Sequence, residues 1–242
     1  MSGGVGPTYN DITLPKEEQH QTQTQTSTIS TGKPAGFFSF RQLNILAIIL
    51  VLSASGLVTI QDFIFTILTL IYFFVLSKLI FPPHNNPNRD APLTSSTNKI
   101  FRIYVTSAGI IGLIIPICYI FEGIVEDDKN GVSAAAPHVF LLACQVFMEG
   151  LASMFGFSAP ARILVPIVYN ARRVLTLVEW IMSEFSREDG TGTVTVSVRR
   201  IYAGKVLAAV NLGIWSFNLF GVLIPVYLPR AFKRYYGSDK EN

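Results

Sequence analysis

The sequence has few charged residues and few cysteines for a chain of 242 residues. Only 14% of its residues are charged, whereas a soluble domain carries about 25%. Together with a hydrophobic content of 50%, this shortage argues against a disordered chain and against a soluble cytosolic enzyme. The two cysteines, Cys118 and Cys144, lie inside apolar segments, which argues against a secreted disulfide scaffold. The composition predicts an all-α polytopic helical membrane bundle.

Motifs for catalysis and for metal binding are also missing. The sequence has no phosphate-binding glycine loop followed by Lys and Ser/Thr, no HExxH motif and no Gly-x-Ser-x-Gly elbow. Its three histidines, His20, His84 and His138, are scattered and predict no metal site. Lys and Arg lie mostly at the ends of apolar segments, and the net charge is only +3, so no nucleic-acid partner is predicted. We therefore expect no catalytic residue, no metal and no cofactor.

Three parts are predicted from the distribution of apolar residues. Residues 1–36 form a polar tail that buries too little surface to offset its ordering entropy, so we predict that it is disordered. Residues 37–236 form a helical transmembrane domain, and residues 237–242 form a C-terminal tail. Apolar runs of about 18 residues or more are long enough to cross a bilayer. Five such spans are predicted, at residues 43–60, 63–81, 103–121, 139–157 and 206–228.

Residues 160–185 are amphipathic, and their place relative to the bilayer is ambiguous. Arg172 and Arg173 would cost about 5–7 kcal/mol at the bilayer centre, more than their apolar neighbours return. We therefore favour a helix that lies at the interface or docks its apolar stripe on the bundle, giving five spans plus one amphipathic helix, over a sixth span. The stripe has helical spacing and comprises Ile163, Leu164, Ile167, Val168, Ala171, Val174, Leu175, Val178, Ile181, Met182 and Phe185.

The distribution of Lys and Arg predicts a cytoplasmic N-terminus. Residues 78–102 and 158–205 are rich in basic residues and are predicted inside, whereas the acidic loop at residues 122–129 has a single Lys and is predicted outside. With five spans, the four basic residues after the last span (Arg230, Lys233, Arg234 and Lys240) would lie outside, against this rule. A sixth span at residues 160–185 would return them inside but would place the basic residues after it outside. Both topologies stay open, and the sequence does not indicate which membrane holds the chain.

Polar side chains inside the predicted spans are the candidate site residues. Glu149 is the only acid well inside a confident span, and Gln145 lies four residues earlier on the same helix face. Asn211 and Asn218 share a face of the last span, so these four residues predict a polar path through the membrane. The alternative is that Glu149 only pairs with a cation or an Asn of another helix. Contacts with the membrane interface are predicted for Arg172, Arg173, Trp180, Arg230, Lys233 and Arg234.

Short strings near the N-terminus resemble a known family. They are residues 1–8 (MSGGVGPT), Asp11-Ile12, Leu14-Pro15-Lys16, residues 39–44 (SFRQLN) and residues 51–56 (VLSASG). These strings are similar to those of a plant-restricted family of uncharacterised multi-pass membrane proteins that carries a domain of unknown function. The resemblance implies an integral membrane protein of plants, and it implies no activity, cofactor or site residue.

Two functions remain, and neither is enzymatic. The first is a membrane organiser or assembly partner that acts through the lipid bilayer and through membrane-protein partners or a homo-oligomer. The amphipathic helix, the basic aromatic C-terminal segment and the polar N-terminal tail favour it. The alternative is a small transporter or channel with Glu149 in a polar intramembrane path and Pro116 and Pro225 as hinge points. Many transporters have internal repeats and this sequence has no convincing one, so the organiser is the first choice.

Overall fold

The chain divides into two units, Met1–Phe37 and Phe38–Asn242, and the fold is that of the second unit. The disordered tail predicted at residues 1–36 lies outside the described residues, and so does the C-terminal tail after Gly237. The computed structural model describes Gly3 and residues 39–83, 99–187 and 196–237.

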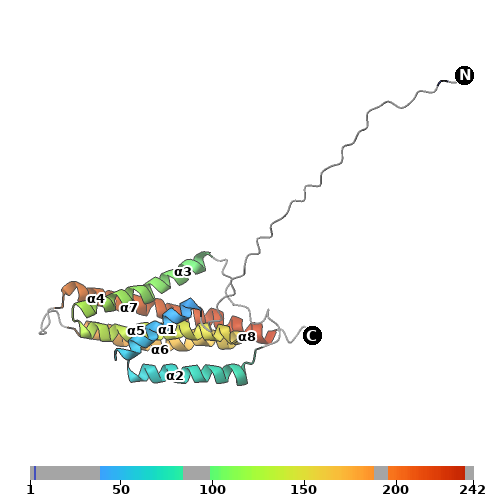
Figure 1. Ribbon diagram of the computed structural model, residues 1–242, viewed down its shortest axis with the longest axis horizontal. Helices are drawn as coiled ribbons and strands as arrows, with labels where there is room; N and C mark the ends of the chain where they lie inside the picture. The colour runs from blue at the N-terminus through green and yellow to red at the C-terminus, as the bar shows by residue number, and fades with distance from the viewer. Residues whose placement is uncertain (1–2, 4–38, 84–98, 188–195, 238–242) are drawn as a thin grey trace. The chain divides into compact units, whose positions relative to one another are not determined.

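Every regular element of the described residues is a helix, as Figure 1 shows, and the all-α prediction is confirmed. Stretches of π-helical hydrogen bonding, labelled η, continue three of the helices without a break. There are six continuous helices in this part of the chain. In chain order their elements are α1 (Phe40–Ala54), α2 (Ile60–Val75) with η1 (Leu76–Ile80), α3 (Lys99–Gly109) with η2 (Ile110–Ile114) and α4 (Ile115–Val125), α5 (Lys129–Met154), α6 (Ala159–Phe185), and α7 (Val198–Ser216) with η3 (Phe217–Tyr227) and α8 (Leu228–Tyr236).

Four of the described helices are long and apolar enough to cross a membrane. They contain or overlap four of the five predicted spans. The predicted span at residues 139–157 is shifted, because α5 begins earlier, at the Asp128 N-cap, and Gly156 follows it with a positive φ of 63°. The four helices are Ile60–Ile80, Arg102–Val125, Lys129–Met154 and Val198–Tyr236.

The predicted span at residues 43–60 contains a helix that ends earlier than predicted, and its crossing of the membrane stays a prediction. The 15-residue α1 ends at Ala54, and Gly56 adopts a φ of 70°, which is the left-handed conformation common after a helix end. The next helix begins after Thr59, whose side chain accepts a hydrogen bond from the backbone N–H of Asp62. A helix as long as α1 rises about 22 Å, less than the ~30 Å hydrocarbon core. The small residues near Gly56 therefore end a helix.

Helix α6 packs against α5, α7, η3 and α8. Figure 1 shows α5, α6 and α7 lying along one another. The predicted docking of the apolar stripe on the bundle holds only for part of the stripe, since Leu164, Val168 and Ile181 pack against the core while α6 turns much of its polar side inward. The buried residues on that side include Tyr169, Asn170, Arg173, Thr176, Trp180 and Glu184, whereas the exposed residues include Leu175, Val178, Met182 and Phe185.

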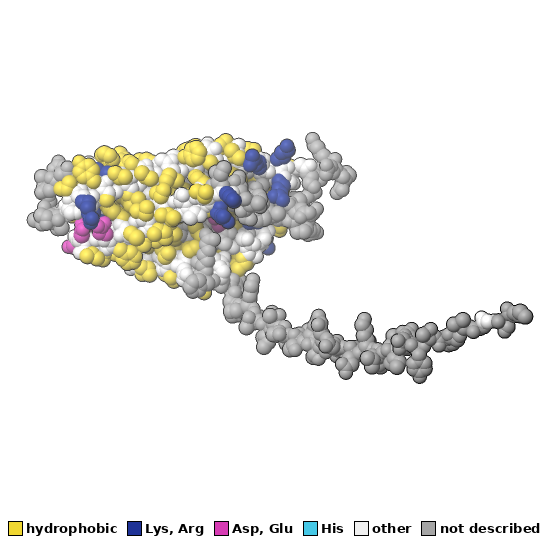
Figure 2. Space-filling view, turned by 90° about the horizontal axis from the view of Figure 1, so that it is seen from above, with side chains coloured by type: hydrophobic (Ala, Val, Ile, Leu, Met, Phe, Trp, Pro, Cys, Tyr) yellow, Lys and Arg dark blue, Asp and Glu magenta, His cyan; other side chains and the backbone are white. Residues whose placement is uncertain are grey.

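The two ends of the bundle are held by different contacts. At one end, here called the α8 end, the Ser158 hydroxyl donates to the Phe81 carbonyl over 2.8 Å and Phe81 packs on Phe232 of α8. At the other end, here called the network end, Asp128 before α5 pairs with Arg200 of α7. Figure 2 shows hydrophobic side chains over much of the face between the ends, with Lys and Arg toward the ends. The bundle thus has an apolar outer surface and polar ends.

Candidate functional site

A cavity of about 760 Å³ lies in the half of the bundle nearest the α8 end, since its α5 and α6 residues flank the α5–α6 turn. Helices α1, α3, α5 and α6 line it together with α7 and η3, and most of the wall is apolar, as at Ile45, Leu142 and Leu223. This volume, with a mainly apolar wall and a few polar groups, is typical of a small-molecule site. The polar wall residues are Asn44, Tyr104, Gln145, Glu149, Arg162, Asn218 and Tyr227.

The structure brings the four residues of the predicted polar path together. Gln145, Glu149 and Asn218 line the cavity, and Gln145 Nε2 donates to Glu149 Oε1 over 2.8 Å. Asn211 is buried directly behind the wall, where its Oδ1 accepts a hydrogen bond from the indole of the wall residue Trp215 over 3.2 Å. Three of the four residues thus line one cavity and the fourth lies behind its wall, and their role as a path through the membrane stays a prediction.

A buried cation lies next to the same wall. The Cζ of Arg173 lies 3.9 Å from the ring centroid of Trp215, so the guanidinium covers one face of an indole that lines the cavity. Arg173 also donates to Oδ1 of Asn170. The indole fits because Gly112 leaves room for it, since a Cβ there would lie 2.5 Å from Cζ2 of Trp215. The prediction that Arg173 contacts the membrane interface is wrong, because it is fully buried.

A second arginine joins α6 to α2. Both Nε and Nη2 of Arg172 lie 2.8 Å from Oδ1 of Asp62, whose side chain is only 1% exposed. The Thr59 hydroxyl donates to the other carboxylate oxygen over 2.8 Å. The pair connects the α1–α2 turn to the middle of α6 across 110 residues of sequence. The sequence analysis did not predict this ion pair, although Asp62 is an acid inside an apolar run and Arg172 is a cation that requires an acidic partner inside a membrane.

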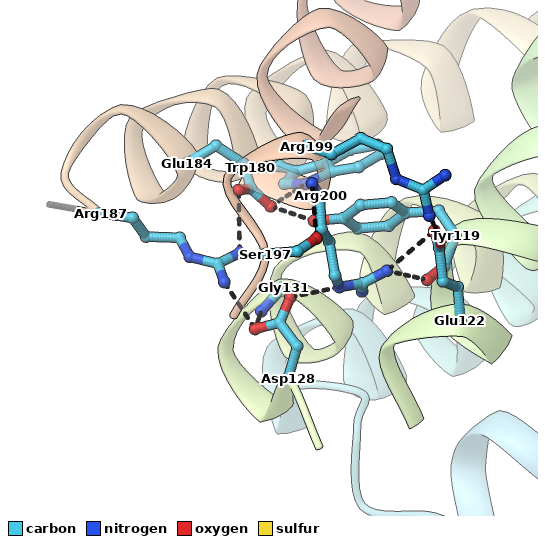
Figure 3. Close-up of polar contacts among 10 residues, drawn as sticks. All are labelled: Tyr119, Glu122, Asp128, Gly131, Trp180, Glu184, Arg187, Ser197, Arg199 and Arg200. Carbon is cyan, nitrogen blue, oxygen red and sulfur yellow. Dashed lines mark hydrogen bonds and ion pairs between the residues drawn. The ribbon is translucent and has the colours of Figure 1, made fainter. Parts of the chain in front are cut away.

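The network end contains a cluster of ion pairs around the aromatic residues Tyr119 and Trp180, shown in Figure 3. The Tyr119 hydroxyl and the Trp180 indole both donate to Glu184 Oε1, over 2.8 and 3.2 Å. Arg187 bridges the acids, with Nη1 donating to Glu184 over 3.0 Å and Nη2 to Asp128 over 2.7 Å. Trp180 is buried in this cluster, so its predicted contact with the membrane interface is also wrong.

Arg200 completes the network from α7. Its Nε donates to Asp128 Oδ2 over 2.7 Å, and its Nη1 donates to the Tyr119 carbonyl over 3.0 Å. Burial raises the pKa of the Asp128 carboxyl. The Gly131 N–H and the guanidinium groups of Arg200 and Arg187 together lower this pKa by more than burial raises it, so the pKa lies below its usual value. Asp128 is therefore ionised over the physiological range of pH and holds three elements together.

The remaining predicted interface residues lie on α8. Arg230 and Lys233 are exposed, and Arg234 is half-buried. The amphipathic side of α8 buries Ala231 and Tyr235 against the bundle. This arrangement leaves basic side chains at the outer edge of the α8 end. Within the described ranges, no group of three His, Cys, Asp or Glu is placed to hold a metal ion.

Comparison with known proteins gives one family and no activity. A family model described as a domain of unknown function (DUF7733) matches residues 38–236, which is most of the chain. Neither a curated protein nor a solved structure matches the chain. The predicted resemblance to a family with a domain of unknown function is thus supported, and its restriction to plants stays a prediction.

Proposed function

The chain belongs to the DUF7733 family, and we propose that its domain is a multi-pass integral membrane protein that acts as a small, non-enzymatic transporter. The observation that carries the proposal is the cavity whose mostly apolar wall includes the polar residues Gln145, Glu149 and Asn218. The sequence favours the organiser on the amphipathic residues 160–185, the basic aromatic C-terminal segment, the polar N-terminal tail and the lack of an internal repeat, and the structure bears on the first of these. Since α6 buries its polar side in the bundle, that support is lost and the transporter moves ahead.

The proposal includes a membrane crossing by α6. From Arg162 to Glu184 the helix rises about 33 Å, close to the ~30 Å thickness of the hydrocarbon core. Of the two arginines in between, one pairs with Asp62 and one is inside the protein, so the cost expected for arginines facing lipid does not apply. Glu179, which is exposed, lies about 7.5 Å along the helix from Glu184 and thus near the polar boundary.

A crossing by α6 also eases the conflict over orientation. It places the α8 end, with its basic residues, on the cytoplasmic side together with the start of α1. At the opposite end, each of Arg187, Arg199 and Arg200 pairs with an acid, which reduces their effect on orientation. A cysteine added after Asn242, in a background without the two native cysteines, should react with an impermeant maleimide only from the cytoplasmic side. Reaction from the opposite side would contradict a crossing by α6.

The arrangement suits transport because the two ends differ. The cavity is near the α8 end, while the network end is closed by ion pairs between α4, α5, α6 and α7. A solute entering from the α8 side reaches Gln145 and Glu149 and meets the closed network beyond them. Release to the other side then requires the helices of the network end to separate. Access from one side at a time is how membrane transporters couple binding to movement.

Proteoliposomes test the proposal directly. The full chain is reconstituted in phosphatidylcholine vesicles that hold a pH-sensitive dye, and the decay of an imposed pH gradient is followed. We expect faster decay with the wild type than with Glu149→Gln, because an ionisable group inside the membrane is a proton site. Glu179→Gln is the matched control, since that acid is exposed on α6 and is not in the cavity wall. Equal rates for the wild type and Glu149→Gln would remove a proton role for Glu149.

The second candidate is a membrane organiser, and the exposed basic residues of α8 favour it. Arg230 and Lys233 lie beside the exposed aromatic Tyr236 at the α8 end, a combination that suits an anionic leaflet. In giant vesicles an organiser should cluster when phosphatidylserine is present, and Arg230→Gln with Lys233→Gln should abolish clustering. Uniform distribution of the wild type would remove this candidate and leave the transporter.

A further inference from the structure

The interior beside the cavity contains hydrogen-bond donors that the protein itself does not use. Arg173 is fully buried, and its Nε and Nη1 have no hydrogen-bond partner in the described part of the chain. Asn170 lies three residues earlier on α6, is also fully buried, and its Nδ2 has no partner there either. Buried polar groups in proteins are nearly always hydrogen-bonded, so unused donors on two neighbouring side chains indicate a ligand.

The unused atoms are all donors, and one side chain carries a positive charge. Because Arg173 has only donors, the Asn170 atom that it contacts is the acceptor Oδ1, which leaves the donor Nδ2 unused. Among the described residues, no carboxylate accepts a hydrogen bond from this guanidinium, and Glu149 acts on it only electrostatically. Such a group of donors matches the oxygens of an anion.

Trp215 connects these donors to the cavity. Its side chain lines the cavity, and the guanidinium lies 3.9 Å from its ring centroid. Arg173 and Asn170 are not themselves wall residues, so binding through them includes a displacement of this indole that brings the guanidinium into contact with a bound molecule. On the wall itself, Gln145 is 6% exposed and its Oε1 is an unused acceptor, which suits a hydroxyl or amide on the body of that molecule.

We infer that Arg173 and Asn170 bind the anionic group of a small organic anion whose apolar body occupies the cavity. The inference rests on the proposed transport function and names its substrate class. A cavity of about 760 Å³ with an apolar wall fits an organic anion better than a bare inorganic ion. Of the residues that the structure describes, the wall itself contains one cation, Arg162, and one acid, Glu149, so the charge that selects an anion is that of the buried Arg173.

The two tryptophans of the chain allow a direct test. In Trp180→Phe, Trp215 is the only tryptophan, and its fluorescence reports on molecules that reach the site. The full chain is placed in phosphatidylcholine nanodiscs and titrated with iodide, an anionic quencher, and with acrylamide, a neutral one. Hexanesulfonate and hexyltrimethylammonium, which share an alkyl chain and differ in charge, are then tested as competitors of iodide.

We expect iodide to quench Trp215 about tenfold more strongly in Trp180→Phe than after the further change Arg173→Gln, because a cationic site concentrates anions. Arg173→Lys should keep the quenching, and acrylamide should act equally on all three. Hexanesulfonate should suppress the iodide effect, and hexyltrimethylammonium should not. Asn170→Asp should abolish the iodide quenching as Arg173→Gln does, because the new carboxylate pairs with Arg173. This variant replaces Arg173→Gln in the test if Arg173→Gln fails to fold.

Two outcomes would overturn the inference, and they separate it from the proposed function. If acrylamide quenches Trp215 but iodide acts equally with and without the Arg173 charge, the cavity is accessible and the anion preference is wrong, while transport of another solute stands. If neither quencher reaches Trp215, the cavity is closed to solutes, and both the inference and the proposed function fail.

Discussion

Two fully buried arginines in the same bundle, Arg200 and Arg173, have opposite surroundings. Arg200 donates to the carboxylate of Asp128 and to the Tyr119 carbonyl, and in the described residues only its Nη2 has no partner. Arg173 donates to the neutral amide of Asn170 and leaves two of its nitrogens unused. Both guanidinium groups lie over an aromatic ring, so the aromatic contact is not what distinguishes them. The difference is the presence or absence of a bound acid.

The difference separates a structural site from a binding site. A buried charge whose hydrogen bonds are satisfied holds helices together, whereas one left half-satisfied costs stability and is kept for another reason. Glycines at the network end agree with the structural role, because they leave room for its side chains. Gly123 adjoins Arg200, and Gly204 adjoins Tyr119 and Glu184. Gly112 likewise leaves room for a side chain, that of Trp215, but this side chain lines the cavity and does not belong to the network of ion pairs.

The largest expected effect is the loss of the central acid of the network. Asp128→Asn removes the charge that pairs with both Arg187 and Arg200, so we expect the free energy of unfolding to fall by about 3–5 kcal/mol. Asp127→Asn is the matched control, because its pair with Lys129 is exposed and should contribute about 0–1 kcal/mol. Unfolding in a titration with denaturing detergent measures both. Similar losses for the two variants would mean that the network does not stabilise the bundle.

A smaller effect is expected when a methyl group is added at the network. Gly204→Ala places a Cβ 2.5 Å from the Tyr119 hydroxyl and should destabilise the protein by about 1–3 kcal/mol. Gly213→Ala, in the same helix α7, has no described atom within 4 Å and should gain up to about 1 kcal/mol from helix propensity. Thermal unfolding of both variants gives the sign of each change in stability. We expect a lower unfolding temperature for Gly204→Ala and an equal or higher one for Gly213→Ala, and a fall of the same size in both would contradict the packing at the network.

The smallest expected effect is that of pH on the network. The pKa of the Asp128 carboxyl is lower in the folded protein than its ordinary value of 3.8. Its stabilisation is therefore complete above that value and is lost as the pH falls through the lowered pKa. Between about pH 7 and pH 5 this group should leave the unfolding temperature unchanged, with a decline that begins near pH 5, where the unfolded carboxyl starts to bind protons. Asp128→Asn should lack this part of the decline, and an identical decline in both proteins would contradict the assignment.

Much of the architecture could be predicted from local patterns. Apolar runs predicted the long helices near residues 63–81, 103–121 and 206–228, since hydrophobic length alone determines them. The spacing of Gln145 and Glu149 placed both on one helix face, and both line the cavity. These features depend on neighbours within about two helical turns, which a sequence displays directly.

The features that were missed depend on partners far along the chain. The insertion cost of Arg172 was counted for a lone arginine, but Asp62 lies 110 residues away and pairs with it. Without that partner, the polar side of residues 160–185 was assigned to the outside. The early end of the helix in the predicted span at residues 43–60 was missed for a local reason, because a φ of 70° at Gly56 ends the helix that its apolar neighbours would continue.

The most direct test of the account compares Arg200→Met with Arg173→Met. Both changes replace a buried guanidinium by an apolar chain of similar length, and unfolding in denaturing detergent measures each free energy. Arg200→Met removes the hydrogen bond and the charge that Arg200 supplies to Asp128, leaves Arg187 as the remaining guanidinium at that carboxylate, and should cost about 3–5 kcal/mol. Arg173→Met removes a charge that no acid neutralises by a hydrogen bond and should be neutral or stabilising by about 1–4 kcal/mol. Equal destabilisation by the two changes would show that Arg173 is structural and would contradict the assignment of a binding site.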